Sequence, residues 1–261
     1  MNNYFLLSLL PLLAYMFIKL KKVFHMLQQN WYNDGNRYIK WIKNNPKKVF
    51  LSFDMVFILF ILFKYISNNI SIILFSSFYL ICIYIFISNQ KKEQIKKPLA
   101  MTARVKRLFA TTMLMMCIII FILYFNFNAN YLFMYYLILG LIVYIAYIVG
   151  FISNVINKPI EKCVFLYYKN KAVNKLNSLN NLKVIGITGS YGKTSSKNIL
   201  NDILNVKYDA FATPKNFNTT YGLIISINNY LDKFSSYFIA EMGAFKRGEI
   251  KELCDLVKPT Y

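Results

Sequence analysis

Charged residues are scarce in this chain, and two long stretches contain none. Only 16% of the 261 residues are charged, whereas 57% are hydrophobic. Residues 65–90 and 108–157 have no Lys, Arg, Asp, Glu or His. Such a composition is not typical of a soluble protein, whose exposed surface needs charge along its whole length. It indicates an integral membrane protein over the first 157 residues.

The longer uncharged stretch must fold back on itself. About 50 residues of helix would extend about 75 Å, more than two bilayer cores. Asn126–Asn130 is the expected turn. The first hydrophobic segment lacks a basic start and a small-residue cleavage site, so we expect an uncleaved anchor. The predicted fold of this region is α-helical with about five transmembrane spans, at about 3–18, 49–66, 70–88, 109–126 and 131–152.

Cysteine and histidine are also sparse. No two of the four cysteines have the spacing of a metal or redox site, so we interpret them as small apolar residues. His25 is the only histidine and is remote from the chemistry described below, which favours a surface or interfacial role. Asp54 and Lys64 lie near the ends of a predicted span, where snorkelling explains their charge.

Acidic residues are few, and the basic excess is unevenly distributed. The net charge is +20, from 31 Lys and Arg against 11 Asp and Glu. Basic residues gather in 19–48 and 91–107, whereas the short turns near Asn68 and Asn128 have none. This positive-inside pattern predicts an outer N-terminus and a cytoplasmic C-terminal part in the plasma membrane. Anionic membrane lipid, not nucleic acid, is the expected partner of these basic residues. In 19–48 they are Lys19, Lys21, Lys22, Arg37, Lys40, Lys43, Lys47 and Lys48.

A change of pattern near residue 157 indicates a boundary. Asn157–Pro159 can begin a helix, and apolar residues then recur at helical spacing among lysines over 158–180. This segment is predicted to be an amphipathic linker helix. Two placements remain open: the helix lies at the membrane surface, or it packs on the following domain.

Strand and helix patterns alternate after residue 180. This order predicts a parallel sheet covered on both faces, that is, a partial α/β domain of the P-loop type over 181–261. About 80 residues are few for such a domain, and Pro259–Tyr261 stands where another strand is expected. We therefore expect the domain to be incomplete. The expected strands are 183–188, 208–212 and 236–241, and the expected helices are 193–205, 220–231 and 247–257.

A glycine-rich segment between the first strand and its helix carries the clearest chemistry. Gly186–Ser195 reads GITGSYGKTS, and its glycines let backbone N–H groups turn toward phosphate oxygens. Lys193 can reach the outer phosphates, and the Thr194 hydroxyl can bind Mg²⁺. The predicted phosphate-binding residues are Gly189, Ser190, Tyr191, Gly192, Lys193, Thr194 and Ser195.

Two further segments are candidates for the same site. Glu241 ends a predicted strand, where ligands bind in open α/β sheets, and is a candidate second Mg²⁺ contact. The alternative for Glu241 is a solvated carboxylate at a strand end. Asn216, Asn218 and Thr219 lie between a strand and a helix, and Asn218 or Thr219 can cap that helix.

Three motifs in order resemble one enzyme family. They are GITGSYGKTS (186–195), TPKNFNTTYG (213–222) and EMGAFKRGEIKELCDLVKP (241–259). Together they resemble the central ATPase domain of the Mur ligases, most closely the D-alanyl-D-alanine-adding type. Ile187 stands where a strict P-loop has its first glycine, but the TGxxGK[ST] form of the family is met.

The resemblance implies a reaction and its cofactors. ATP and Mg²⁺ would activate a carboxylate of a peptidoglycan-type precursor as an acyl phosphate, and an amino acid or dipeptide would attack it to form an amide. It implies Lys193 and Glu241 as catalytic residues, Thr194 and Glu241 as metal ligands, and Asn216, Asn218 and Thr219 beside the nucleotide. Membrane spans replace the sugar-nucleotide domain with which these ligases begin. Two other hypotheses remain: a non-catalytic nucleotide-binding membrane module or inactive fragment, and a transporter or sensor with an ATPase domain.

Overall fold

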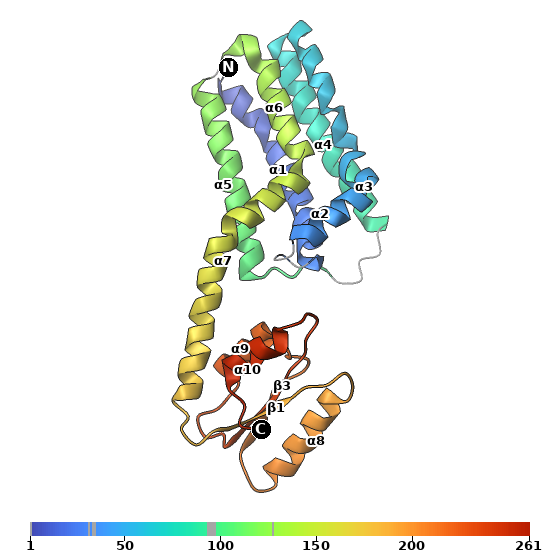
Figure 1. Ribbon diagram of the computed structural model, residues 1–261. Helices are drawn as coiled ribbons and strands as arrows, with labels where there is room; N and C mark the ends of the chain where they lie inside the picture. The colour runs from blue at the N-terminus through green and yellow to red at the C-terminus, as the bar shows by residue number, and fades with distance from the viewer. Residues whose placement is uncertain (1, 31, 33–34, 93–97, 127) are drawn as a thin grey trace. The chain divides into compact units, whose positions relative to one another are not determined.

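The computed structural model describes residues 2–30, 32, 35–92, 98–126 and 128–261. The chain divides into two compact units, Met1–Pro159 and Ile160–Tyr261, and each is described by itself. The first unit is built from helices (Figure 1). In chain order they are α1 (Asn2–Gln29), α2 (Gly35–Asn44), α3 (Pro46–Phe50), the 3₁₀ helix η1 (Phe53–Tyr65), α4 (Asn68–Lys92), α5 (Ala103–Phe125), η2 (Ala129–Tyr131), α6 (Leu132–Tyr144) and the first part of α7 (Ala146–Asn177).

Three helices among the described residues are long and apolar enough to cross a bilayer. They contain Tyr4–Gln29, Asn68–Gln90 and Ala103–Phe125. The pair Ala129–Tyr144 and Ala146–Asn177 passes the same test together but bends by 71°, which gives up to four spans. The segment predicted as a span at 49–66 contains a 3₁₀ helix of 13 residues and is not among them. The expected number of five spans is therefore not confirmed.

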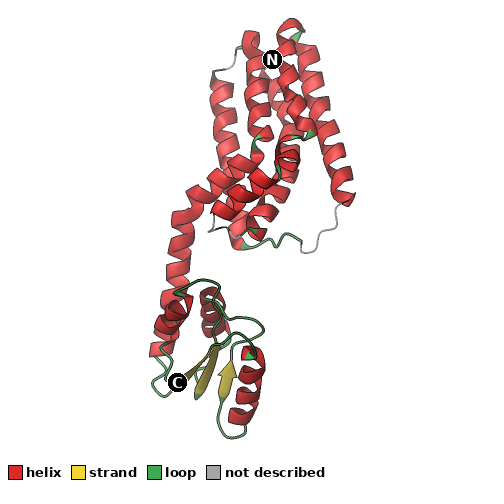
Figure 2. Cartoon of the chain, turned by 45° about the vertical axis from the view of Figure 1, so that its right-hand side comes forward, coloured by secondary structure: helices red, strands yellow, loops and turns green. Residues whose placement is uncertain are grey.

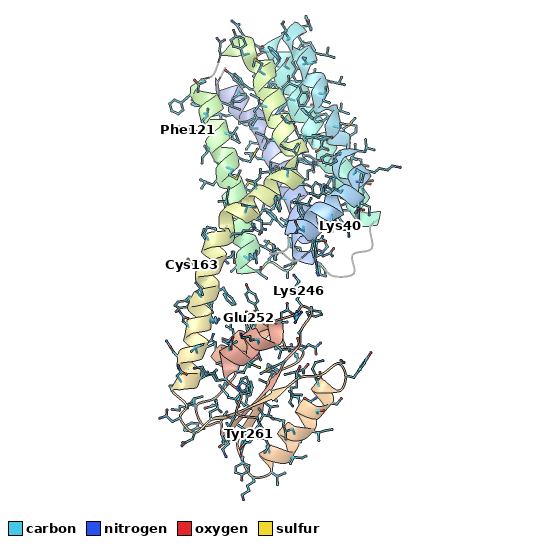
Figure 3. All side chains as sticks on the ribbon, in the orientation of Figure 1. Lys40, Phe121, Cys163, Lys246, Glu252 and Tyr261 are labelled. Carbon is cyan, nitrogen blue, oxygen red and sulfur yellow. The ribbon has the colours of Figure 1, made fainter. Side chains whose placement is uncertain are left out.

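The outer surface of the first unit is apolar. Large hydrophobic side chains are more than half exposed on several helices, as at Ile58, Ile73 and Leu114. Phe121 is 62% exposed and extends from α5 away from the other helices (Figure 3). Aromatic rings fill the interior instead, and the rings of Phe75 and Tyr136 stack with centroids 3.9 Å apart. An apolar exterior around an apolar interior is expected where lipid, not water, surrounds the helices.

A buried ion pair lies inside this unit. Lys19 of α1 and Asp54 of η1 are each 1% exposed, and the Lys19 ammonium donates to the Asp54 carboxylate. Lys19 Nζ also donates to the carbonyl oxygens of Val143 at 3.0 Å and Tyr144 at 3.2 Å. Two predictions are therefore wrong: Lys19 is not in a basic loop, and Asp54 does not snorkel to the surface. His25, for which a surface or interfacial role is predicted, is buried.

The position of this pair explains its carbonyl contacts. Helix α6 ends at Tyr144, and α7 begins at Ala146 after the bend. The last carbonyl groups of a helix lack intrahelical donors and carry partial negative charge. Lys19 supplies both the donors and the positive charge at that end, so it ties α1, η1 and the bend together.

The second unit is a small parallel sheet with flanking helices (Figure 2). The strands pair in the order β1-β3-β2, with Ile187 opposite Glu241 and Ala212 opposite Ile239. All six elements lie within two residues of the ranges expected from the sequence. They are β1 (Lys183–Ile187), α8 (Lys193–Asn205), β2 (Ala210–Ala212), α9 (Thr220–Asn229), β3 (Tyr237–Glu241) and α10 (Glu249–Val257).

The C-terminal residues follow the free edge of β1. Thr260 N donates to Val184 O at 2.7 Å, and Gly186 N donates to Tyr261 O at 2.9 Å. These hydrogen bonds place residues 260–261 beside β1, where the sequence pattern predicts another strand, but the sheet itself has three strands.

The part of α7 from Ile160 onward belongs to the second unit and packs on its core. Ala172 is fully buried in its core, and the rings of Phe165 and Tyr221 lie 4.9 Å apart. Asn228 Nδ2 donates to Tyr168 O at 3.0 Å. Of the two placements left open for this segment, the contacts favour packing on the α/β unit. The prediction that a helix begins near Pro159 is wrong, because Pro159 lies inside α7.

Candidate nucleotide-phosphate site

The loop between β1 and α8 needs glycine at two positions. Gly189 has φ +147° and Gly192 has φ +76°. Residues other than glycine rarely adopt these backbone angles. Gly192 is the N-cap of α8, and its carbonyl accepts the first helical hydrogen bond, from Ser196 N at 2.9 Å. The loop between these positions is exposed, with Tyr191 95% exposed. The free N–H groups of the first turn of α8 are thus presented at an open loop, as an anion site requires.

Lys193 and Thr194 begin α8 and extend in different directions. Lys193 Nζ donates to Gly189 O at 2.7 Å, so the ammonium folds back over the loop. Thr194 Oγ1 lies 3.1 Å from each carboxylate oxygen of Glu241. The two predicted Mg²⁺ contacts, which are 47 residues apart in the sequence, are therefore brought together.

Glu241 is the centre of a buried polar cluster. It is the last residue of β3 and is only 2% exposed, so the alternative of a solvated carboxylate is wrong. Its Oε1 accepts a hydrogen bond from Asn218 Nδ2 at 3.3 Å, and its Oε2 lies 3.1 Å from Lys197 Nζ. A buried carboxylate needs hydrogen-bond donors and positive charge to offset its desolvation, and this cluster supplies both.

Lys197 belongs to the site although the sequence prediction omitted it. It is 2% exposed, and its ammonium also donates to Lys215 O at 3.0 Å. Lys215 lies in the loop after β2 and has φ +50°, a left-handed backbone conformation that is uncommon for a residue other than glycine. Lys197 therefore contacts this loop at its left-handed residue. The signal was available: Lys197 follows Lys193 by four residues and Thr194 by three, and such residues share one helix face.

The segment after β2 contributes mainly through its backbone and one amide side chain. Asn218 O accepts from Gly243 N at 2.8 Å, and Asn218 N donates to Asn216 O at 2.9 Å. Thr219 Oγ1 accepts from Gly222 N at 3.3 Å as the N-cap of α9. The structure thus places Asn218 in the cluster, Asn216 beside it, and Thr219 in the capping position that the sequence left as an alternative.

Thr213 is a second residue that the prediction omitted as a site residue. Its hydroxyl accepts a hydrogen bond from Glu241 N at 3.1 Å, and its side chain is 1% exposed. Its own N–H donates to Ile239 O at 3.0 Å. Thr213 therefore fixes the end of β3 from which the Glu241 carboxylate extends.

The donor set fits Mg²⁺ by its chemistry. Mg²⁺ prefers hard oxygen ligands and is usually held by one or two carboxylates or hydroxyls together with substrate phosphates and water. Thr194 Oγ1 and the Glu241 carboxylate converge beside the phosphate loop. Lys197, on the same carboxylate, is positioned to orient it.

This geometry is that of an α/β domain with a phosphate-binding loop, and comparison with known proteins shows what this part of the chain is similar to. Residues 187–261 match the family model of the Mur ligase middle domain. Two relatives are named UDP-N-acetylmuramoyl-tripeptide--D-alanyl-D-alanine ligase. The protein from Rickettsia prowazekii is 43% identical and that from Bacillus subtilis 35% identical, each over 77 residues.

The similarity is confined to a short part of each protein. The match covers 30% of this chain and 17% of each of the two relatives. A solved structure of MurF from Acinetobacter baumannii is 32% identical, with a TM-score of 0.35, and the match covers 36% of this chain and 21% of that one.

Removal of the Lys197 charge is expected to destabilise the second unit. Lys197→Met leaves the buried Glu241 carboxylate without its cation, which costs about 3–5 kcal/mol for a buried pair. Hydrogen exchange of the β3 amide groups measures this loss of stability. The matched control is Lys193→Met, since Lys193 is partly exposed and contacts only Gly189 O among the described residues. Equal stability of the two variants would contradict the assigned pairing.

Glu249 gives the start of α10 a pH dependence. Its Oε2 accepts hydrogen bonds from Phe245 N at 2.6 Å and Lys246 N at 3.0 Å, and these hold the pKa of the carboxyl below its ordinary value. Because the pKa of Glu249 is lower in the folded state, its ionised form stabilises the fold at pH values above its pKa in the unfolded chain, which is about 4.3. This stabilisation is lost as the pH falls through the pKa of the folded state.

The expected result is faster amide exchange in α10, after correction for intrinsic rates, as the pH falls below about 4. Glu249→Gln removes this dependence, whereas Glu252→Gln on the same exposed helix face keeps it. A dependence that survives in Glu249→Gln would show that another group is responsible.

Proposed function

We propose that this chain is the membrane-embedded, ATP-binding part of an acid–amino acid ligase of the Mur ligase type. The observation that carries the proposal is the convergence of Thr194 and Glu241 beside the phosphate loop. The family match over 187–261 and the names of the relatives support the ligase class. The matched segment is only 17% of each relative's length. That this protein carries out the complete ligase reaction is therefore proposed.

The residues of the site have distinct roles in this proposal. Mg²⁺-ATP, when bound, supplies the phosphoryl group that activates a carboxylate of a peptidoglycan-type precursor for amide formation with an amino acid or dipeptide. Lys193 swings from Gly189 O to neutralise the outer phosphates. Thr194 and Glu241 hold the metal ion, and Lys197 keeps the Glu241 carboxylate aimed at it.

We further propose that the first unit lies in the plasma membrane and crosses it five times. Its exposed apolar side chains support this placement. The helix η1 adds the fifth span, because 13 residues at about 2.0 Å each extend about 26 Å, close to the bilayer core of about 30 Å. Figure 1 places the start of α1 and the turn between η1 and α4 at one end of the unit, and α2 and α3 at the other. The basic end faces the cytoplasm, where ATP is available.

Cysteine labelling tests this orientation. After the four natural cysteines are replaced, a cysteine at Asn69 is expected to react with an impermeant maleimide on intact cells. A cysteine at Lys171 is expected to react only after lysis. Labelling of both positions on intact cells, or of Lys171 alone, would contradict the proposed topology.

Acceptor-dependent phosphate release tests the ligase function. The full chain in lipid nanodiscs is given MgATP, a precursor with a free carboxylate, and D-alanyl-D-alanine. Phosphate release that requires the carboxylate, and that is lost in Lys193→Ala, supports a ligase. MgATP binding without such release favours the second candidate function, a non-catalytic nucleotide-binding membrane module.

The membrane unit suggests which acceptor is used. Since spans replace a soluble sugar-nucleotide domain, we propose that the membrane unit brings the site to lipid-linked envelope precursors. Activity should then be higher on a lipid-linked carboxylate than on its soluble counterpart. Equal activity on the two acceptors would contradict this part of the proposal.

A further inference from the structure

The first unit contains an apolar pocket of about 380 Å³ among α2, α3 and the start of α7. This volume lies in the range of small-molecule and cofactor sites. Its walls are aliphatic and aromatic side chains, among them Ile39, Ile42, Phe50, Ile148 and Phe151, and its one charged lining residue is Lys43. Apart from Lys43, the walls offer no group that would recognise a polar ligand, so the apolar part of a ligand must occupy the interior.

The pocket is held open by an anchored helix. Tyr38 of α2 is 1% exposed, stacks on Phe151 with ring centroids 6.0 Å apart, and donates to Tyr147 O at 3.1 Å. The next residue, Ile39, remains 38% exposed at the rim, and Ile148 is 40% exposed. Because Tyr38 fixes α2 against α7, these apolar walls stay uncovered instead of collapsing onto each other.

Lys43 lines the pocket, and three further lysines lie on the same two helices. Lys40, Lys43, Lys47 and Lys48 are exposed on α2 and α3, and within the described part of the chain none of them forms an ion pair. Figure 3 shows Lys40 on α2, at the same end of the bundle as α3. An apolar interior with unpaired ammonium groups at the rim is complementary to one kind of molecule: an acyl chain with an anionic head group.

We propose that this pocket binds one phosphate-bearing membrane lipid. Its acyl chain lies along Ile39, Ile148 and Phe151, and its phosphate is bound at the rim by Lys40 and Lys43, with Lys47 adjacent. Ammonium groups make charge-assisted hydrogen bonds to phosphate and attract anionic lipids at a membrane surface. The inference rests on the proposed membrane location and goes beyond a general attraction of basic loops to the bilayer, because it defines a site for a single lipid.

Native mass spectrometry of the full chain in a neutral detergent tests the proposal. Dioleoyl phosphatidylglycerol is expected to remain bound with one molecule per chain, at least tenfold more tightly than dioleoyl phosphatidylcholine. The triple variant Lys40→Gln, Lys43→Gln, Lys47→Gln is expected to lose this preference. Ile148→Trp, which fills the pocket, is expected to weaken the binding of both lipids. Unchanged binding in Ile148→Trp would overturn the proposal.

A matched control separates this site from general electrostatics. Lys171→Gln, Lys207→Gln, Lys251→Gln removes the same charge from exposed positions of the second unit. If this control lowers the preference for the anionic lipid as much as the rim variant does, the proposal is overturned. Glycerol phosphate that competes as well as the intact lipid would also overturn it, because the site would then bind phosphate alone.

Two measurements keep the outcomes distinct. If Ile148→Trp fails to fold, as judged by its thermal midpoint, Ile39→Trp at the exposed rim replaces it. Lipid binding does not use the nucleotide site, so its failure together with correct cysteine labelling would overturn only this inference. Failure of the labelling experiment would instead overturn the membrane location on which it rests.

Discussion

Lys193→Ala is expected to weaken MgATP binding by roughly 10- to 150-fold. This range corresponds to the loss of a hydrogen bond to a charged group, about 1.5–3 kcal/mol. Lys193 is the residue of the loop whose ammonium can leave Gly189 O and reach the outer phosphates. Isothermal titration of the full chain in nanodiscs at fixed Mg²⁺ measures the change in affinity.

The control for this variant is an exposed lysine outside the site. Lys171→Ala removes the same charge from α7 and is expected to leave the affinity unchanged. Lys193→Ala should also keep the thermal midpoint of the wild type, because the residue is not part of a core. Wild-type ATP affinity in Lys193→Ala would contradict the assignment of the phosphate loop.

Lys19→Met is expected to lower the free energy of unfolding of the first unit by about 3–5 kcal/mol. The variant leaves Asp54 buried without its cation and removes the donors from the carbonyl groups of Val143 and Tyr144. Unfolding in a denaturing detergent measures the effect. Lys64→Met, which removes an exposed lysine from η1, is the control and is expected to change little.

A second variant distinguishes an unpaired charge from a general packing defect. Asp54→Leu together with Lys19→Met removes both charges and is expected to recover most of the lost stability, as apolar replacement of buried pairs often does. If the double variant is less stable than Lys19→Met alone, the Asp54 carboxylate contributes through contacts other than the ion pair, such as its hydrogen bond from Ser52. If Lys19→Met is as stable as the wild type, the pair does not hold the bend between α6 and α7.

The parts that could be predicted from the sequence depend on local order. The loop from Gly189 to Lys193 lies between a strand and a helix within a few residues, and its residue types alone indicate phosphate binding. The alternation of strands and helices after residue 180 likewise predicts the parallel sheet. Glu241 could be placed at the site because the end of a strand in such a sheet has a known relation to the ligand crevice.

The parts that could not be predicted depend on contacts between distant segments. Lys19 and Asp54 are 35 residues apart, and a hydropathy pattern counts their charges without pairing them. The hydrophobic composition of 53–65 predicts a span but does not distinguish a 3₁₀ helix from an α-helix. The spacing of Lys197 from Lys193 and Thr194 indicates a shared helix face, but its burial follows only from the packing of α8, because a lysine in a helix is usually exposed.

The Mg²⁺ dependence of ATP binding tests the central claim most directly. ATP is titrated into the full chain in nanodiscs with and without Mg²⁺, for the wild type, Thr194→Val, Glu241→Gln and the exposed control Glu252→Gln (Figure 3). We predict that Mg²⁺ tightens binding in the wild type and in Glu252→Gln, and that this gain is lost in Thr194→Val and Glu241→Gln. Equal affinity with and without Mg²⁺ in the wild type, or a full Mg²⁺ effect in Glu241→Gln, would contradict the proposed site.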